Sequence, residues 1–157
     1  MRQRDVLPIV NRGGIVYGIM LESIVIDTNV LVSALRSKQG ASFKLLNLVG
    51  RGLFETVVSV PLMLEYEDVL SREYLALPPK AVDDVLDYLC AVSSNRRIFY
   101  LWRPVLKDLK DDLVLELAVE AQCTSIVTYN TRHFVEAEMF GIKTETPLEF
   151  LTRLELL

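Results

Sequence analysis

Polar side chains that can bind a cation follow three runs of apolar residues that we interpret as strands. Asp27 ends the first run, Glu65 lies about one turn into the helix after the second, and Asn130 stands just past a later one. In parallel sheets ligands bind beyond the carboxyl ends of the strands, so we expect these residues at the functional edge of the sheet. Three more acids run into the helix before the later strand: Asp108, Asp111 and Asp112.

Such a set of acids favours metal chemistry. Carboxylates that converge repel one another unless a cation neutralises them or some of them stay protonated. Oxygen ligands of this kind prefer Mg²⁺ or Mn²⁺. A bound ion can activate water and stabilise the oxyanions of an in-line phosphoryl displacement. The residues therefore predict hydrolysis of a phosphodiester.

Other common catalytic patterns are missing from the sequence. It contains neither GxxxxGK[ST] nor GxGxxG, so no glycine-rich phosphate loop is predicted. His133 is the single histidine, which leaves no Ser–His–Asp set to propose. Cys90 and Cys123 lie in apparent helices without CxxC or CxxH neighbours, and we interpret them as two small buried thiols in a reducing compartment.

Each candidate residue also has a purely structural interpretation. Asp27 could cap the helix that follows it, and Glu65 could be a solvated helix residue. Asp111 and Asp112 stand at a helix N-terminus, where negative charge is favoured, and this explains one of the two without any ligand role. Thr128 and Asn130 could form a turn. The joint position of the acids after the strands is more specific than any single residue.

An alternation of strands and helices must position these residues. The strands are short apolar runs and the helices show apolar residues at helical spacing. Continuous apolar strands separated by helices imply a parallel sheet covered on both faces, that is, an α/β fold in three layers. The predicted strands are 23–26, 54–60, 97–102, 124–128 and 142–144, and the predicted helices are 30–35, 42–50, 62–71, 81–92, 111–122, 132–140 and 147–154.

The composition is that of one compact domain. The chain has 157 residues, of which 51% are hydrophobic, and its mean hydropathy is +0.30. Its apolar runs are too short for a membrane span, and we expect a cytoplasmic protein. A net charge of −4 argues against a broad basic face for nucleic acid, although bound cations would invert the local sign.

The first 22 residues differ from the rest of the chain. They are basic and are interrupted by Gly13 and Gly14. We interpret residues 1–22 as an N-terminal extension and residues 23–157 as the domain. The extension is either a flexible tail, which we favour, or a hairpin around Asn11–Gly14 that adds to a sheet edge.

Five segments, four of which carry candidate residues, resemble a PIN domain, specifically the toxin components of prokaryotic toxin–antitoxin systems, over residues 23–154. IVIDTNVLVSAL at 24–35 resembles the family's opening strand and first acid, Asp27. SVPLMLEYEDVL at 59–70 places the second acid on Glu65. DLKDDLVLELAVEA at 108–121 carries the third, which we assign to Asp112 because it stands three residues before Leu115. SIVTYNTRHF at 125–134 and GIKTETPLEFL at 141–151 match the last two strands.

The resemblance implies a five-stranded parallel sheet in the order 3-2-1-4-5 and Mg²⁺- or Mn²⁺-dependent cleavage of single-stranded RNA. It also implies a toxin role with an antitoxin protein as partner, and frequent homodimers. The short apolar runs separately predict no association with a membrane. Asn130 departs from the family pattern, in which a fourth acid is common here. An amide oxygen binds a metal less strongly, so one metal is held firmly and a second only with substrate, or Asp108 or Asp111 compensates.

These implications give each residue a role. Asp27, Glu65 and Asp112 bind the ion that activates water, and Asn130 is a weaker ligand. Hydrogen bonds from neighbouring residues then hold the carboxylates in place; the candidates for this supporting role are Thr28, Asn29, Asp108, Asp111 and Thr128. The candidate phosphate contacts are Arg36, Lys107, Arg132 and His133.

Two rival functions stay open. One is a PIN domain that binds RNA or a protein without cutting, which the Asn130 departure favours. The other is a phosphatase or phosphoacceptor that uses Asp27, against which stands the absence of a lysine past the late strand, where the sequence has Tyr129 and Asn130.

Overall fold

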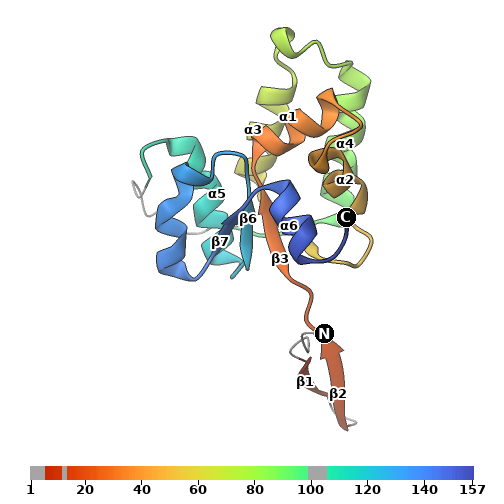
Figure 1. The fold of residues 1–157 in the computed structure, drawn as a ribbon, viewed down its shortest axis with the longest axis vertical. Coiled ribbons are helices and arrows are strands. Elements are labelled where there is room, and N and C mark those ends of the chain that lie inside the picture. Colours follow the sequence, from red (N-terminus) through yellow and green to blue (C-terminus); the bar gives the residue numbers. More distant parts are fainter. Residues whose placement is uncertain (1–5, 12–13, 99–105) are drawn as a thin grey trace.

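The computed structural model describes residues 6–11, 14–98 and 106–157. Its central sheet has five parallel strands in the order β5-β4-β3-β6-β7 (Figure 1). The order along the chain is 3-2-1-4-5, so the predicted α/β fold is confirmed. The strands are β3 Ser23–Ile26, β4 Glu55–Val58, β5 Ser94–Asn95, β6 Ser125–Val127 and β7 Lys143–Glu145.

Helices cover both faces of this sheet. On one face α5 packs against β3, β4 and β6, and on the other α6 packs against β7 and α2 (Figure 1). The side chains from Ile24 to Ile26 are at most 1% exposed, as expected for a strand buried on both faces. The α-helices are α1 Thr28–Arg36, α2 Ala41–Leu48, α3 Val60–Leu70, α4 Pro79–Val92, α5 Leu109–Glu120 and α6 Pro147–Arg153.

Local signals fix where these helices begin. Ser59 caps α3 by accepting a hydrogen bond from the Leu62 amide at 3.3 Å, with Pro61 in the first turn. Thr146 and Glu149 form a reciprocal capping box at the start of α6. The described residues also form 3₁₀ segments at η1 Glu73–Leu75 and η2 Thr131–Phe140. The second lies where the helix 132–140 was expected and is kinked at Phe134, whose backbone is not helical. No helix in the described ranges is long and apolar enough to span a membrane.

Three predictions differ from the structure. The strand beside β4 is Ser94–Asn95, whose register pairs Val57 with Ser94. Of the strand predicted at 97–102, residues 97 and 98 are not in a strand, and residues 99–102 lie outside the described ranges. Cys90 is exposed on α4, and of the two cysteines only Cys123 is buried. The N-terminal segment is not the favoured tail.

That segment forms an antiparallel hairpin, β1 Val6–Asn11 and β2 Gly14–Ile19. It makes a two-stranded sheet of its own and extends beyond the amino end of β3 (Figure 1). The hairpin alternative therefore describes the local structure correctly, whereas the expected addition to a sheet edge does not occur.

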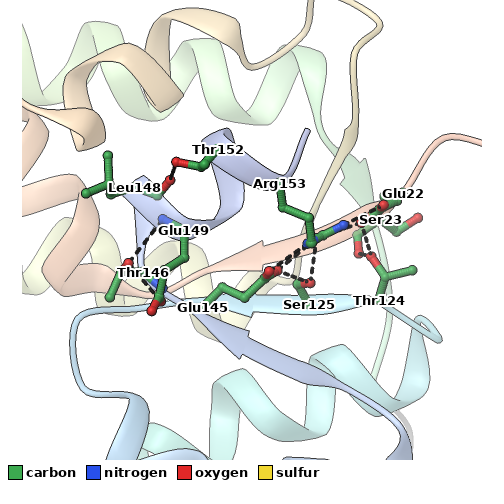
Figure 2. A network of polar contacts seen from close by, with 10 residues as sticks. All are labelled: Glu22, Ser23, Thr124, Ser125, Glu145, Thr146, Leu148, Glu149, Thr152 and Arg153. Carbon is green, nitrogen blue, oxygen red and sulfur yellow. Dashed lines mark hydrogen bonds and ion pairs between the residues drawn. The ribbon is translucent and has the colours of Figure 1, made fainter. Parts of the chain in front are cut away.

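A network of charged residues ties α6 to the sheet (Figure 2). Arg153 donates to both carboxylate oxygens of Glu22 at 2.8 and 2.9 Å and to both of Glu145 at 2.6 and 2.8 Å. Ser125 donates to Glu145 at 2.7 Å, and the Arg153 guanidinium also lies 5.5 Å from the centre of the Phe150 ring. We call Glu22, Ser125, Glu145 and Arg153 the arginine cluster.

Candidate metal centre

Asp27 stands at the junction of β3 and α1, and both oxygens of its carboxylate accept hydrogen bonds. Its Oδ1 accepts from the Thr28 amide at 2.7 Å. Its Oδ2 accepts from the Thr128 hydroxyl at 2.6 Å and from the Asn29 side-chain amide at 2.9 Å. Asn29 also accepts from the Tyr129 amide, so the end of β6 is tied to the start of α1. The carboxylate is thus held in a fixed orientation, and the residue is buried, with 8% of its surface exposed.

Glu65 reaches the same place from α3. The next residue, Tyr66, is buried, and its hydroxyl donates a short hydrogen bond to the Ile26 carbonyl just before Asp27. Glu65 directly precedes Tyr66, and Asp27 directly follows Ile26. This hydrogen bond therefore holds the backbone that carries Glu65 next to the backbone that carries Asp27. The Glu65 carboxylate forms an ion pair with Lys110, with 3.0 Å between Nζ and Oε1.

A cavity of about 270 Å³ brings the candidate residues together. It is open to solvent at the carboxyl end of the sheet and includes acids from α3, the α5 start and the end of β3. We call this the acidic cleft. Its lining consists of Asp27, Thr28, Asn29, Val32, Glu65, Val69, Asp108, Lys110, Asp111 and Asn130.

Asp112 is absent from that lining. Its side chain is 1% exposed, and its Oδ1 accepts from the Leu106 amide at 2.9 Å. The structure therefore brings Asp111, and not Asp112, into the cleft. Asp112 holds the chain where it enters α5 through Oδ1, and its Oδ2 is buried without a hydrogen-bond partner among the described residues. Asp111 lines the cleft with the other acids, so the choice of Asp112 made from the spacing to Leu115 stays a prediction.

The charges in the cleft are poorly compensated. Burial raises the pKa of Asp27, and the charge of Asp111 raises it further, against the hydrogen bonds from Thr128 and Thr28. Burial also raises the pKa of Asp111, with contributions from Asp108 and Asp112, although the contact with His133 opposes the shift. The His133 Nδ1 lies 3.0 Å from the Asp111 Oδ2. These shifts show that the folded protein disfavours the negative charge that the cleft carries at neutral pH.

A second, larger cavity of about 750 Å³ adjoins the cleft and shares Asp108, Lys110 and Asp111 with it. Lys107, Arg132 and His133 line it, so three of the four expected phosphate contacts lie together. The exposed side chains of Leu109 and Val135 add apolar surface. Arg36 lines neither cavity: it ends α1, two turns beyond Asp27.

The donors in the cleft suit a hard divalent cation, because carboxylate and amide oxygens predominate. Among the residues that the structure describes, no group of three His, Cys, Asp or Glu side chains is already close enough to hold an ion. Lys110 accounts for part of this, since it occupies Glu65. The residues therefore fit a metal in kind, and at Glu65 a metal competes with Lys110.

Two residues of this site were not found from the sequence. Lys110 is flanked by acids in the segment DLKDD, which offered a signal: a single cation within an acidic run neutralises one of them. Tyr66 lies among the polar residues of α3, and its buried hydroxyl could be recognised only once α3 was placed against β3. The Thr28 amide, the Asn29 side-chain amide and the Thr128 hydroxyl all donate to the Asp27 carboxylate. The supporting role expected of these residues stays a prediction.

Comparisons with known proteins agree with this arrangement. By structure the chain is similar to VapBC2 from Rickettsia felis, solved bound to a DNA fragment from their promoter, with a TM-score of 0.55. The match has 16% identity and covers 79% of this chain and 98% of that chain, and it supports the fold. A search among curated proteins found no match. The family model described as "PIN domain" matches residues 23–132, more than half of the sequence. The chain therefore belongs to the PIN domain family, whose members are generally nucleases that use divalent metal ions.

Proposed function

We propose that this protein is a divalent-metal-dependent ribonuclease that hydrolyses phosphodiester bonds of single-stranded RNA. The observation that carries the proposal is the acidic cleft, in which Asp27, Glu65 and Asp111 come from three different elements and line one cavity at the carboxyl end of the sheet. The raised pKa values of Asp27 and Asp111 support the need for a cation there.

Asp27, Glu65 and Asp111 would hold Mg²⁺ or Mn²⁺, with Asn130 as a neutral oxygen ligand. When bound, the ion supplies a Lewis acid that lowers the pKa of water and neutralises charge on the phosphate. Thr128 and Asn29 orient the Asp27 carboxylate by donating to it, and the hydrogen bond from Thr128 opposes the rise in its pKa. The His133 ring contacts Asp111, with 3.0 Å between Nδ1 and Oδ2, and helps to orient that carboxylate.

The larger cavity supports a single-stranded substrate. Lys107 and Arg132 offer positive charge to a phosphate backbone, and exposed Leu109 and Val135 offer apolar surface to unpaired bases. A duplex hides its bases from such a surface. RNA rather than DNA rests on the resemblance of the sequence to toxin-component PIN domains.

The cellular role that we propose is that of a toxin controlled by an antitoxin protein, with a homodimer as a further expectation. The similar structure is of the pair VapBC2 on their promoter DNA, which favours a protein partner for this chain as well. A cytoplasmic location is consistent with this role.

The rival with a specific observation in its favour is a domain that binds RNA without cutting it. Asn130 replaces a carboxylate, and Lys110 already neutralises Glu65. Both features weaken metal binding.

One experiment separates the two functions. A labelled single-stranded RNA is incubated with the protein in Mn²⁺, in EDTA and, as a matched variant, with Asp27→Asn in Mn²⁺. We expect cleavage only by the wild type with metal. RNA binding without cleavage by a folded wild-type protein in Mn²⁺ would establish the non-cutting domain, and cleavage by Asp27→Asn at the wild-type rate would remove Asp27 from the site.

A further inference from the structure

Lys110 occupies a special position, because it lines both the acidic cleft and the larger cavity. Its ammonium group lies 3.0 Å from the Glu65 carboxylate. About half of its side chain is exposed, 51%, whereas that of Glu65 is 16% exposed. A long flexible stem that stands in solvent can turn between the two cavities without moving the helix.

The ion pair and a metal site compete for the Glu65 carboxylate. The Lys110 ammonium group donates to a Glu65 oxygen that a metal would also use. An ammonium group has no lone pair, so it cannot itself be a ligand of the metal. A divalent cation next to Glu65 also repels the positive charge of Lys110, since like charges a few ångströms apart disfavour each other. The two cations therefore bind Glu65 in competition.

We propose that Lys110 exchanges partners when metal binds. In the metal-free protein it neutralises Glu65; in the metal-loaded protein it turns into the larger cavity and contacts a phosphate of the nucleic acid. This inference rests on the proposed function and adds a positioning residue that couples metal binding to substrate binding. Lys107 and Arg132 line the cavity into which Lys110 turns, so its charge would join an existing cationic surface.

The exchange predicts opposite effects on the two ligands. Removing Lys110 abolishes a competitor for Glu65, so metal should bind more tightly. Removing it also deletes one phosphate contact, but only when metal has displaced Lys110 from Glu65. Neither effect is expected from a lysine that merely stabilises the start of α5.

Metal binding is measured first, without nucleic acid, by titrating Mn²⁺ and following free Mn²⁺ by electron paramagnetic resonance. We expect Lys110→Gln to bind Mn²⁺ about fivefold more tightly than wild type, because a half-exposed ion pair of this kind contributes at most about 1 kcal/mol. Lys110→Arg, which keeps the charge, should stay near the wild type. Lys107→Gln is the matched control: it removes a nearby positive charge that lines the larger cavity and is absent from the cleft lining.

Phosphate contact is measured second, by fluorescence anisotropy of a single-stranded RNA oligonucleotide at several salt concentrations. Ca²⁺ replaces Mn²⁺ in order to slow cleavage. In Ca²⁺ the loss of one contact should reduce the slope of log affinity against log salt by about 0.7 in Lys110→Gln. In EDTA the slopes of Lys110→Gln and wild type should agree, whereas Lys107→Gln should lower the slope in both conditions.

The outcomes keep the two proposals apart. Equal Mn²⁺ affinity in wild type and Lys110→Gln, or an equal gain in Lys107→Gln, overturns the exchange and leaves the proposed nuclease standing. A slope that Lys110→Gln lowers in EDTA as much as in Ca²⁺ overturns it as well. Absence of Mn²⁺ binding in every folded variant removes both proposals.

Discussion

Two groups of carboxylates contact the same sheet, and they are neutralised in different ways. In the arginine cluster, Arg153 contacts both Glu22 and Glu145. The hydrogen bond from Arg153 lowers the pKa of Glu22. Burial alone would raise the pKa of Glu145, but the hydrogen bonds from Arg153 and Ser125 outweigh it, so that this pKa is also lowered. In the acidic cleft the pKa values of Asp27 and Asp111 are raised instead.

The difference lies in the partners rather than in the acids. Both groups are partly or largely buried, and both lie among hydrogen-bond donors. The arginine cluster contains its own permanent cation, whereas in the cleft the single lysine pairs with Glu65 and the nearest base to Asp111 is a histidine. A group of acids that is neutralised from within favours stability. One that is left short of positive charge favours the binding of an external cation, at a cost in stability when that cation is missing.

The largest effect that tests this comparison concerns the two adjacent aspartates of α5. Asp111→Asn removes a carboxylate from the cleft, and we expect cleavage to fall by about 10³-fold, equivalent to about 4 kcal/mol of transition-state stabilisation. Asp112→Asn keeps an oxygen that can accept from the Leu106 amide, so cleavage should stay within about tenfold of the wild type. Initial rates on a labelled single-stranded RNA measure both.

Mn²⁺ affinity is the control that shows whether the two variants are folded and which of the two aspartates binds the metal. Asp111→Asn should weaken it, and Asp112→Asn should leave it close to the wild type. If the two variants showed the reverse pattern, the ligand would be Asp112, as the spacing to Leu115 suggested, and the local rotation of α5 in solution would differ from the one described.

The next largest effect is the loss of protein stability when the arginine cluster loses its cation. Arg153→Met breaks the ion pairs with Glu22 and Glu145 and leaves two carboxylates partly buried without a cation. We expect the free energy of unfolding to fall by about 2 kcal/mol, less than for a fully buried pair because Arg153 is 28% exposed. Urea denaturation followed by circular dichroism measures the loss.

The matched control is Lys143→Met, because Lys143 acts on Glu22 and Glu145 only through its charge and is exposed. Its stability should change by less than about 0.5 kcal/mol. The Mn²⁺ affinity of Arg153→Met should equal that of the wild type. A marked loss of Mn²⁺ affinity in the folded variant would show that the two groups of acids are coupled and that the comparison between them fails.

A smaller effect is expected at Asn130, where the cleft lacks a carboxylate. Asn130→Asp adds a charged oxygen ligand, and we expect Mn²⁺ to bind about tenfold more tightly, or about 1.4 kcal/mol. The metal-free variant should be less stable than the wild type, because the added negative charge lies near Asp27 and Asp111, whose pKa values are already raised. Isothermal titration with Mn²⁺ and thermal unfolding in EDTA measure the two effects. Unchanged Mn²⁺ affinity would place residue 130 outside the ligand set.

The sequence predicts most of the fold because its signals are local and repeated. Buried parallel strands read as continuous apolar runs, and Ser23–Ile26 was predicted with the bounds that the structure has. The strand Ser94–Asn95 escaped prediction because it is short and polar, and its place in the sheet depends on pairing with Val57 and Val58. Hydropathy carries no information on such a pairing.

The candidate site shows the same limit at the level of single side chains. Asp27 and Glu65 were predicted because each follows a strand directly or by one helical turn. Asp111 and Asp112 could not be separated by type, since successive residues of a helix point about 100° apart and spacing does not fix how the helix is rotated. That rotation is set by tertiary packing, and it directs Asp112 toward the Leu106 amide and Asp111 toward the cleft.

The smallest effect, and the one that tests the sign of the comparison, is the pH dependence of stability in EDTA. An acid with a raised folded pKa adds stability only below its ordinary pKa, and this contribution is lost as the pH rises through the folded pKa. At neutral pH the charge of Asp111 therefore costs stability, and Asp111→Asn should be more stable than the wild type by about 0.5 kcal/mol. Both proteins carry His133→Gln, so that titration of the imidazole facing Asp111 does not contribute.

Lowering the pH should act on the two groups in opposite directions. From about pH 7.5 to about pH 4 the advantage of Asp111→Asn should shrink, because the wild-type carboxyl gains its proton in the folded state first. The deficit of Arg153→Met should persist over most of this range. Glu22 and Glu145 have folded pKa values below the ordinary 4.5, so their contribution is lost only as the pH falls through those lower values. Parallel pH profiles for the two variants would mean that both groups of acids are neutralised alike, and the case for an external cation in the cleft would lose its electrostatic support.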